Sequence, residues 1–82
     1  MTGLVRFERP VVIQIGRYTE RTVFDVNDAA SILLRDFGGH QTEKHRAAMD
    51  ACLKVIRGEL HPPAARRAFV AVAREAKILR CD

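Results

Sequence analysis

Residues 10–28 decide the fold, and they read PVVIQIGRYTERTVFDVND. The first part is rich in β-branched residues and places Val11, Ile13 and Ile15 on one face of an extended chain, which is typical of a strand. A second run of β-branched and aromatic residues, 18–24, follows the turn at Gly16 and Arg17. Two such runs on either side of a glycine-containing turn predict a β-hairpin.

The hairpin sequence allows two registers. A two-residue turn sets Ile13 opposite Glu20, whereas a three-residue loop sets Val11 opposite Val23 on the same face. We favour the second register because it keeps one face of the hairpin apolar. A lone hairpin is not stable in water, so we expect this apolar face to pack on helices.

The first helix is expected directly after the hairpin. Asp25 is suited to the N-cap, and Asp28 places a carboxylate in the first turn, where the helix dipole favours it. The pattern predicts a helix that runs to about Phe37 and ends at Gly38-Gly39. Because its apolar residues cover a wide arc, we expect it to be the central helix, contacted on more than one side.

Two more helices complete the predicted domain. Thr42 is a candidate N-cap for a helix that runs to about Arg57 and ends at Gly58. A third helix begins at His61-Pro62-Pro63, because proline is favoured in a first turn, and continues to about Lys77. Its apolar residues are spaced four, three, four and three apart, which predicts a core-facing seam of Ala65, Phe69, Val72, Ala76 and Leu79. The predicted fold class is therefore α+β: one small domain over residues 1–82, with an N-terminal β-hairpin packed on three α-helices.

Several short motifs along the chain occur together in one family of proteins. They are Phe7 with Pro10-Val-x-Ile, Val23 before a capped Asp-Ala, Ala47-x-x-x-Ala51-Cys52, and Ala65-Arg66-x-Ala68-Phe69-Val70-x-x-Ala73-x-Glu75-Ala76. Through the order and spacing of these motifs, nearly the whole chain resembles the small bacterial proteins grouped as domain of unknown function 982. The resemblance implies a short stand-alone domain and supplies no established activity or catalytic residues.

Two positions depart from the pattern of that family. Members often carry Trp-Pro where this chain has Phe37-Gly38, at the end of the first predicted helix. Glycine is common where Lys77 stands, so the resemblance implies that the last helix runs on slightly in this chain.

Length and composition exclude several classes of protein. Eighty-two residues form one small domain, whose core cannot spare the volume of a large enclosed substrate cavity. The proportions of 48% hydrophobic and 29% charged residues are not those of a disordered chain. No uninterrupted apolar run approaches the length of a membrane span, and the N-terminal residues MTGLVRFERP lack the apolar core of a signal peptide. We therefore expect a cytoplasmic protein that does not bind a membrane.

The cysteines and histidines do not predict a catalytic or metal site. Cys52 and Cys81 form no CxxC pair, so we expect free thiols, with a disulfide between the two as the open alternative. Cys52 falls on an apolar helix face, where burial raises a thiol pKa and makes the group inert. His40 and His45 are five residues apart and share no helix face, and His61 begins a helix, so we interpret the histidines as solvated.

No motif indicates an enzyme. The sequence has no paired carboxylates spaced for acid–base work, no phosphate-binding glycine loop and no GxSxG elbow. We therefore predict that the protein is not an enzyme and uses no cofactor or metal. The leading hypothesis is a non-enzymatic interaction or accessory module.

The best candidate for a functional surface is the polar face of the third helix. Arg66, Arg67, Arg74 and Lys77 lie on one arc opposite the apolar seam, and Arg80 follows. In a chain of net charge +4, such a stripe would neutralise several phosphates, so nucleic-acid binding or regulation is the alternative function. The helix opens with Pro-Pro-Ala-Ala, which carries no side chains that read bases, and the aromatic content is only 6%. The competing interpretation is a solvated face, because the charge is spread along the sequence.

A third hypothesis is self-association into a homodimer. Leu53 and Val70 fall toward the polar sides of their predicted helices, and the hairpin offers at least one open strand edge. A two-fold dimer through strand edges or helices is the commonest closed arrangement.

Overall fold

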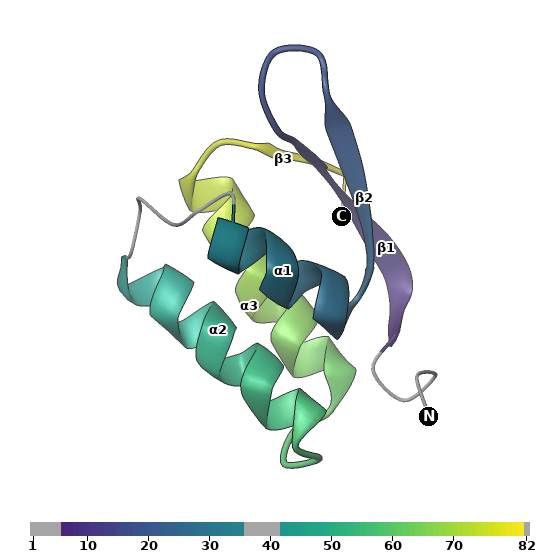
Figure 1. Ribbon diagram of the computed structural model, residues 1–82, viewed down its shortest axis with the longest axis vertical. Helices are drawn as coiled ribbons and strands as arrows, with labels where there is room; N and C mark the ends of the chain where they lie inside the picture. Colours follow the sequence, from purple (N-terminus) through teal and green to yellow (C-terminus); the bar gives the residue numbers. More distant parts are fainter. Residues whose placement is uncertain (1–5, 36–41, 82) are drawn as a thin grey trace.

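The computed structural model describes residues 6–35 and 42–81 and has the predicted α+β architecture (Figure 1). A hairpin of β1 (Arg6–Gln14) and β2 (Glu20–Asp25) precedes three helices, α1 (Val26–Arg35), α2 (Glu43–Ile56) and α3 (Pro62–Glu75). A short strand, β3 (Leu79–Cys81), follows α3 and was not predicted. The three strands form one antiparallel sheet in the order β2-β1-β3.

The register of the hairpin is the predicted one. Val11 pairs with Val23, and the Ile15 N–H donates to the Thr19 carbonyl at 2.7 Å, which leaves a three-residue loop. Gly16 opens that loop with a φ of +84°, a conformation that costs glycine nothing. Val11, Ile13 and Val23 are fully buried, so this register places the apolar face of the hairpin in the core.

The start of β1 contains a bulge that the sequence pattern did not predict. Arg6 pairs with Asp25 and Val11 with Val23, so four residues of β1 stand opposite the single residue Phe24. Extra residues bend a strand and increase its local twist. Residues 7–10 form the extra stretch, and Pro10 within it has no N–H to contribute to a ladder.

The end of α3 differs from the prediction. The Ile78 N–H donates to the Ala73 carbonyl at 3.0 Å and the Lys77 N–H to the Arg74 carbonyl at 3.1 Å, which together form a Schellman cap. Lys77 takes the left-handed conformation this cap requires, with a φ of 62°. The helix therefore ends at Glu75, and the prediction that it runs on at Lys77 is wrong.

Beyond this cap the chain turns back along β1 as β3. Leu79 pairs with Ile13 and Cys81 with Val12, which makes β1 the central strand of the sheet.

The predicted seam of α3 is therefore correct only in its first part. Its first three members are buried, whereas Ala76 is exposed and Leu79 lies on β3.

The predicted helix starts are confirmed. Asp25 accepts a hydrogen bond from the Asp28 N–H at 2.8 Å, and the Thr42 hydroxyl accepts one from the His45 N–H at 3.2 Å. Proline occupies the first two positions of α3. Gly58 ends α2 as predicted, with a φ of +85°. The predicted stop of the first helix at Gly38-Gly39 lies outside the described residues.

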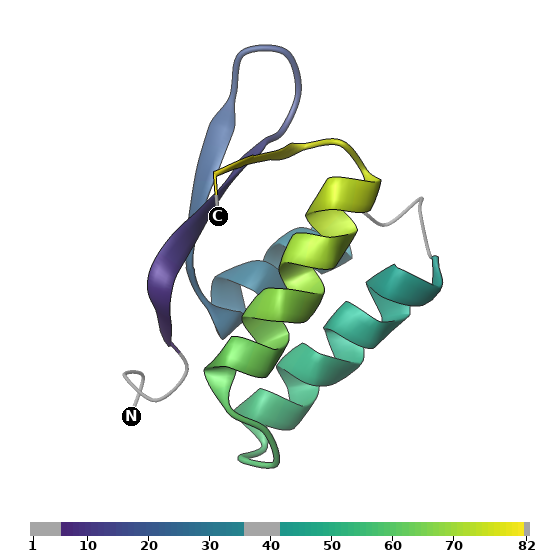
Figure 2. The ribbon, with the colours of Figure 1, turned by 180° about the vertical axis from the view of Figure 1, so that it is seen from behind.

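The three helices lie on one side of the sheet, and the hairpin tip extends past them (Figure 2). The core between these layers contains fully buried side chains from both, among them Ile13, Leu33, Cys52 and Phe69. Helix α1 contacts β2, α2 and α3, so contact on more than one side is confirmed. The central position, however, belongs to α3, which contacts α1, α2, β1 and β3.

Candidate functional site

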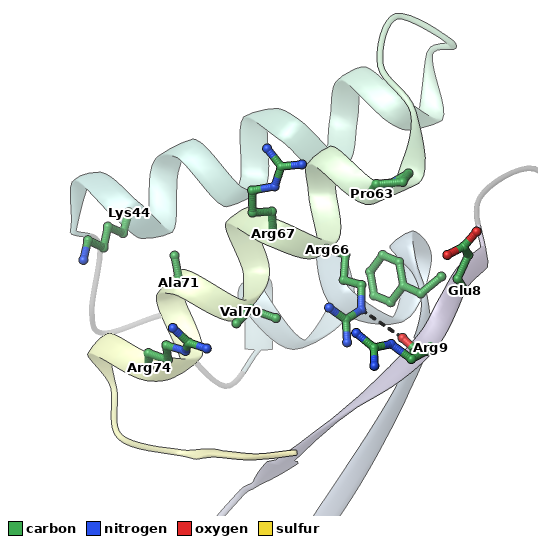
Figure 3. Close-up of a pocket in the computed structure, with 10 residues that line it drawn as sticks. Glu8, Arg9, Lys44, Pro63, Arg66, Arg67, Val70, Ala71 and Arg74 are labelled. Carbon is green, nitrogen blue, oxygen red and sulfur yellow. Dashed lines mark hydrogen bonds between the residues drawn. The ribbon is translucent and has the colours of Figure 1, made fainter. Parts of the chain in front are cut away.

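A hollow of about 590 Å³ opens between α3, the bulged start of β1 and the first turn of α2 (Figure 3). We call it the basic hollow, and it is lined by Phe7, Glu8, Arg9, Lys44, Pro63, Arg66, Arg67, Val70, Ala71 and Arg74. Its volume falls within the range of small-ligand sites. Phe7 and Val70 are buried and form its floor, whereas most of the other lining residues are exposed. It is therefore a hollow in the surface and not an enclosed cavity.

Helix α3 supplies six of the ten residues that line the basic hollow. Pro63, Arg67, Val70 and Arg74 follow one another at intervals of four, three and four residues, and Arg66 and Ala71 lie beside this row, so these residues share one broad face of the helix. The opposite face carries the buried residues that pack in the core. Three residues of the polar arc predicted for this helix, Arg66, Arg67 and Arg74, therefore line a concave part of the surface.

Val70 has a different role from the one expected. Its exposed fraction is only 8%, and it lies among the residues lining the hollow. It is therefore not an exposed apolar residue available for self-association. Leu53, the other residue named for that role, is 41% exposed.

The bulge in β1 supplies the second wall. It brings Phe7, Glu8 and Arg9 to the hollow, and the Nε of Arg66 donates a hydrogen bond to the Arg9 carbonyl at 2.9 Å. Figure 3 shows the Arg66 side chain extending from α3 to the β1 backbone at this bond. The bond holds the Arg66 guanidinium at the rim. Because this side chain is already ordered in the free protein, less conformational entropy is lost when a ligand binds.

Lys44 reaches the hollow from the first turn of α2. The Thr42 hydroxyl donates a hydrogen bond to the Glu75 carboxylate at 2.7 Å, which joins the start of α2 to the end of α3. This connection places Lys44 at the same end of the hollow as Arg74 (Figure 3).

The basic hollow concentrates the excess charge of the chain. Five of the fourteen basic residues and one of the ten acidic residues line it, which leaves nine of each elsewhere. The net charge of the hollow, +4, therefore equals that of the whole chain. Like charges gathered over a low-dielectric floor raise the local potential and attract anions. Charge that is spread along the sequence is thus collected in one place by the fold.

The structure brings together most, but not all, of the predicted surface. Arg66, Arg67 and Arg74 line the hollow, whereas Lys77 does not, because it occupies the turn after the helix. Sequence reasoning missed Arg9 and Lys44. Neither lies on the third helix, and no periodic pattern connects either residue with it.

One histidine contradicts its predicted environment. His45 is buried within α2, not solvated, and its Nε2 donates a hydrogen bond to the Leu33 carbonyl of α1 at 2.8 Å. His61 is exposed at the N-cap of α3, and His40 lies outside the described residues. Within residues 6–35 and 42–81, no group of three or more histidine, cysteine or acidic residues is placed to hold a metal ion.

The two cysteines are free thiols. Cys52 is buried, and desolvation raises its pKa from 9.0 to about 11, as the sequence pattern predicted. Cys81 is exposed on β3. Neither thiol lies among the residues that line the basic hollow.

Residues 9–80 match the family described as Protein of unknown function (DUF982), and the chain belongs to that family. The match confirms the resemblance seen in the sequence motifs. No curated protein and no solved structure matches the chain significantly. Among the helices in the described part of the chain, none combines the length and the apolar character needed to cross a membrane.

Proposed function

We propose that this protein is a non-enzymatic interaction module that holds an anionic partner in the basic hollow. The observation that carries the proposal is the concentration of charge: the hollow has a net charge of +4, and the remainder of the chain is balanced. A concave site with an apolar floor and a cationic rim suits a ligand that has both apolar and anionic parts. Arginine forks match carboxylate and phosphate groups in geometry as well as in charge.

The chemistry of the lining residues supports binding rather than catalysis. Guanidinium groups stay charged at every physiological pH, so they attract and orient anions without exchanging protons. Glu8 is the one carboxylate among the ten lining residues. The buried thiol and the buried imidazole lie elsewhere, in Cys52 and His45.

Nucleic-acid binding is the second candidate for the same hollow. It is favoured by the position of Arg66, Arg67 and Arg74, which line one solvent-accessible site. Contacts of these residues to phosphates would release counterions, so affinity would fall steeply as salt is raised.

Two further expectations from the sequence stay predictions. One is a cytoplasmic location. The other is a homodimer through strand edges or helices, and the two outer edges of the described sheet are those of β2 and of the three-residue β3. Sedimentation of the purified protein over a range of concentrations tests the homodimer.

The proposed function is tested by reversing charge inside and outside the hollow. Arg67→Glu and Arg17→Glu change the net charge equally, but Arg67 lines the hollow and Arg17 lies in the exposed hairpin loop. Binding of a fluorescein-labelled polyglutamate and a labelled oligothymidylate is followed by fluorescence anisotropy at low and physiological salt. We expect Arg67→Glu to weaken binding of at least one probe by about tenfold and Arg17→Glu by less than about twofold. Equal losses would show that only net charge matters, and absence of binding at low salt would end the proposal.

A further inference from the structure

Three residues of α3 form a regular row along the basic hollow. Arg66, Val70 and Arg74 follow one another at intervals of four residues. At about 1.5 Å per residue, the two arginines are separated by about 12 Å along the helix axis, and Val70 lies midway between them. The row therefore presents a cationic position, an apolar position and a second cationic position in line.

An extended peptide has a matching repeat. Residues i, i+2 and i+4 of a strand point to one side and are separated by about 6.7 Å per step, so i and i+4 are about 13 Å apart. Carboxylates at i and i+4 would reach Arg66 and Arg74, while an apolar side chain at i+2 would meet the floor of the hollow, where Ala71 is half-buried beside the more deeply buried Val70. The difference of about 1 Å is within the reach of the long, exposed side chain of Arg74.

The surroundings of the row fit the same occupant. Phe7, Pro63 and Ala71 also line the hollow and extend its apolar floor beyond Val70. Arg67 and Lys44 flank the row, and within the described part of the chain neither makes an ion pair or a side-chain hydrogen bond. Their charge is therefore not neutralised by another described side chain.

We infer that the basic hollow binds an extended acidic segment of a partner protein, with the pattern acidic–x–apolar–x–acidic. The inference rests on the proposed function and names the class of ligand. Glu8 also lines the hollow, and its carboxylate can accept hydrogen bonds from main-chain N–H groups of the bound segment.

The same features disfavour a nucleic acid as the occupant. Single strands gain affinity by stacking bases on exposed aromatic rings, whereas Phe7, the one aromatic side chain that lines the hollow, is only 8% exposed. A charged rim over an apolar floor suits alternating acidic and apolar side chains better than a uniformly anionic backbone.

The inference is tested with synthetic peptides and the full chain. The probe is a fluorescein-labelled peptide containing glutamate–serine–leucine–serine–glutamate between glycine–serine flanks. One control has the same composition with the two glutamates adjacent and the leucine at the end, and another replaces leucine by serine. At physiological salt we expect the probe to bind about tenfold more tightly than either control. Equal affinity for all three peptides would overturn the proposed pattern.

Variants of the floor give an independent test. Ala71→Glu places a carboxylate on the floor, and Ala47→Glu makes the same substitution at an exposed position of α2 outside the hollow. We expect Ala71→Glu to weaken binding of the leucine-containing probe by about tenfold and Ala47→Glu to leave it within about twofold, with unchanged circular dichroism in both. Equal effects of the two variants would overturn the assignment of the floor.

The outcomes separate this inference from the proposed function. If labelled oligothymidylate binds more tightly than the probe and Arg67→Glu abolishes its binding, the hollow is an anion site but the peptide class is wrong. If neither probe binds even at low salt, both the proposed function and the inference fail.

Discussion

Replacing Lys77 by glycine should stabilise the protein. Lys77 occupies the C′ position of the Schellman cap that ends α3, with a φ of 62°. Gly58 occupies the equivalent position after α2, with a φ of +85°, and there the Glu59 and Gly58 N–H groups donate to the Lys54 and Val55 carbonyls. The two helices thus end in the same motif, once with glycine and once with lysine.

The expected gain follows from the backbone conformation. In the left-handed region, steric contacts of the Cβ raise the free energy of the folded state by about 1–2 kcal/mol. Glycine has no Cβ and avoids these contacts, but its larger loss of conformational entropy on folding destabilises the protein by about 0.4–1 kcal/mol. The net stabilisation from Lys77→Gly is therefore about 1 kcal/mol, which for a domain of this size corresponds to a rise in Tm of about 4–8 °C.

Urea denaturation followed by circular dichroism measures this difference directly. Gly58→Lys is the matched reverse substitution, and we expect it to destabilise by a similar amount, because a Cβ at Gly58 meets no atom within 4 Å. Lys77→Ala keeps the Cβ and should gain little. Since Lys77 does not line the basic hollow, Lys77→Gly should also leave anion binding within about twofold. An unchanged or lowered midpoint for Lys77→Gly, with Gly58→Lys equally neutral, would refute the backbone argument.

Three further predictions concern the helix contacts and the thiols. Thr42→Ala removes the N-cap of α2 and the bond to α3, and we expect a loss of about 1–2 kcal/mol of stability in urea denaturation. His45→Ala leaves the Leu33 carbonyl without its imidazole donor and should cost about 1–3 kcal/mol in the same assay; a neutral result would show that water replaces the ring. At pH 8, iodoacetamide should modify Cys81 in the native protein and Cys52 only after unfolding, because burial raises the Cys52 pKa to about 11; mass spectrometry showing two rapid native adducts would contradict this.

The local features of the fold could be predicted because each rests on nearby residues. The alternation of Val11, Ile13 and Val23 selects one hairpin register, and the side chains of Asp25 and Thr42 mark helix starts by the bonds they accept. Such signals depend on the two-residue alternation of side chains along a strand or on hydrogen bonds within one helical turn. They can therefore be recognised in the sequence without the tertiary structure.

The third strand was missed because its residues fit two periodicities. Leu79 continues the four-and-three spacing of α3, and this spacing predicts a helical position for it. What separates it is Lys77, which enters a left-handed conformation that sequence reasoning assigns to glycine. Tertiary pairing of β3 with β1 outweighs that local cost.

The candidate site was predicted only as far as one helix could show it. Arg66, Arg67 and Arg74 share a helical face, which follows from spacing alone. Arg9 joins them through the β1 bulge, and Lys44 joins them through the packing of α2 on α3. Both depend on contacts between distant segments, so the concentration of charge emerges only in the folded chain.

The central claim is that the basic hollow is where an acidic partner binds. Titrating the nitrogen-15-labelled protein with the glutamate–serine–leucine–serine–glutamate peptide and recording amide chemical shifts tests it most directly. We predict that the largest shifts fall on Glu8, Arg67 and Ala71, and that amides of β2 and α1 change little. Largest shifts on β2 or α1, or shifts of equal size over the whole chain, would contradict the claim.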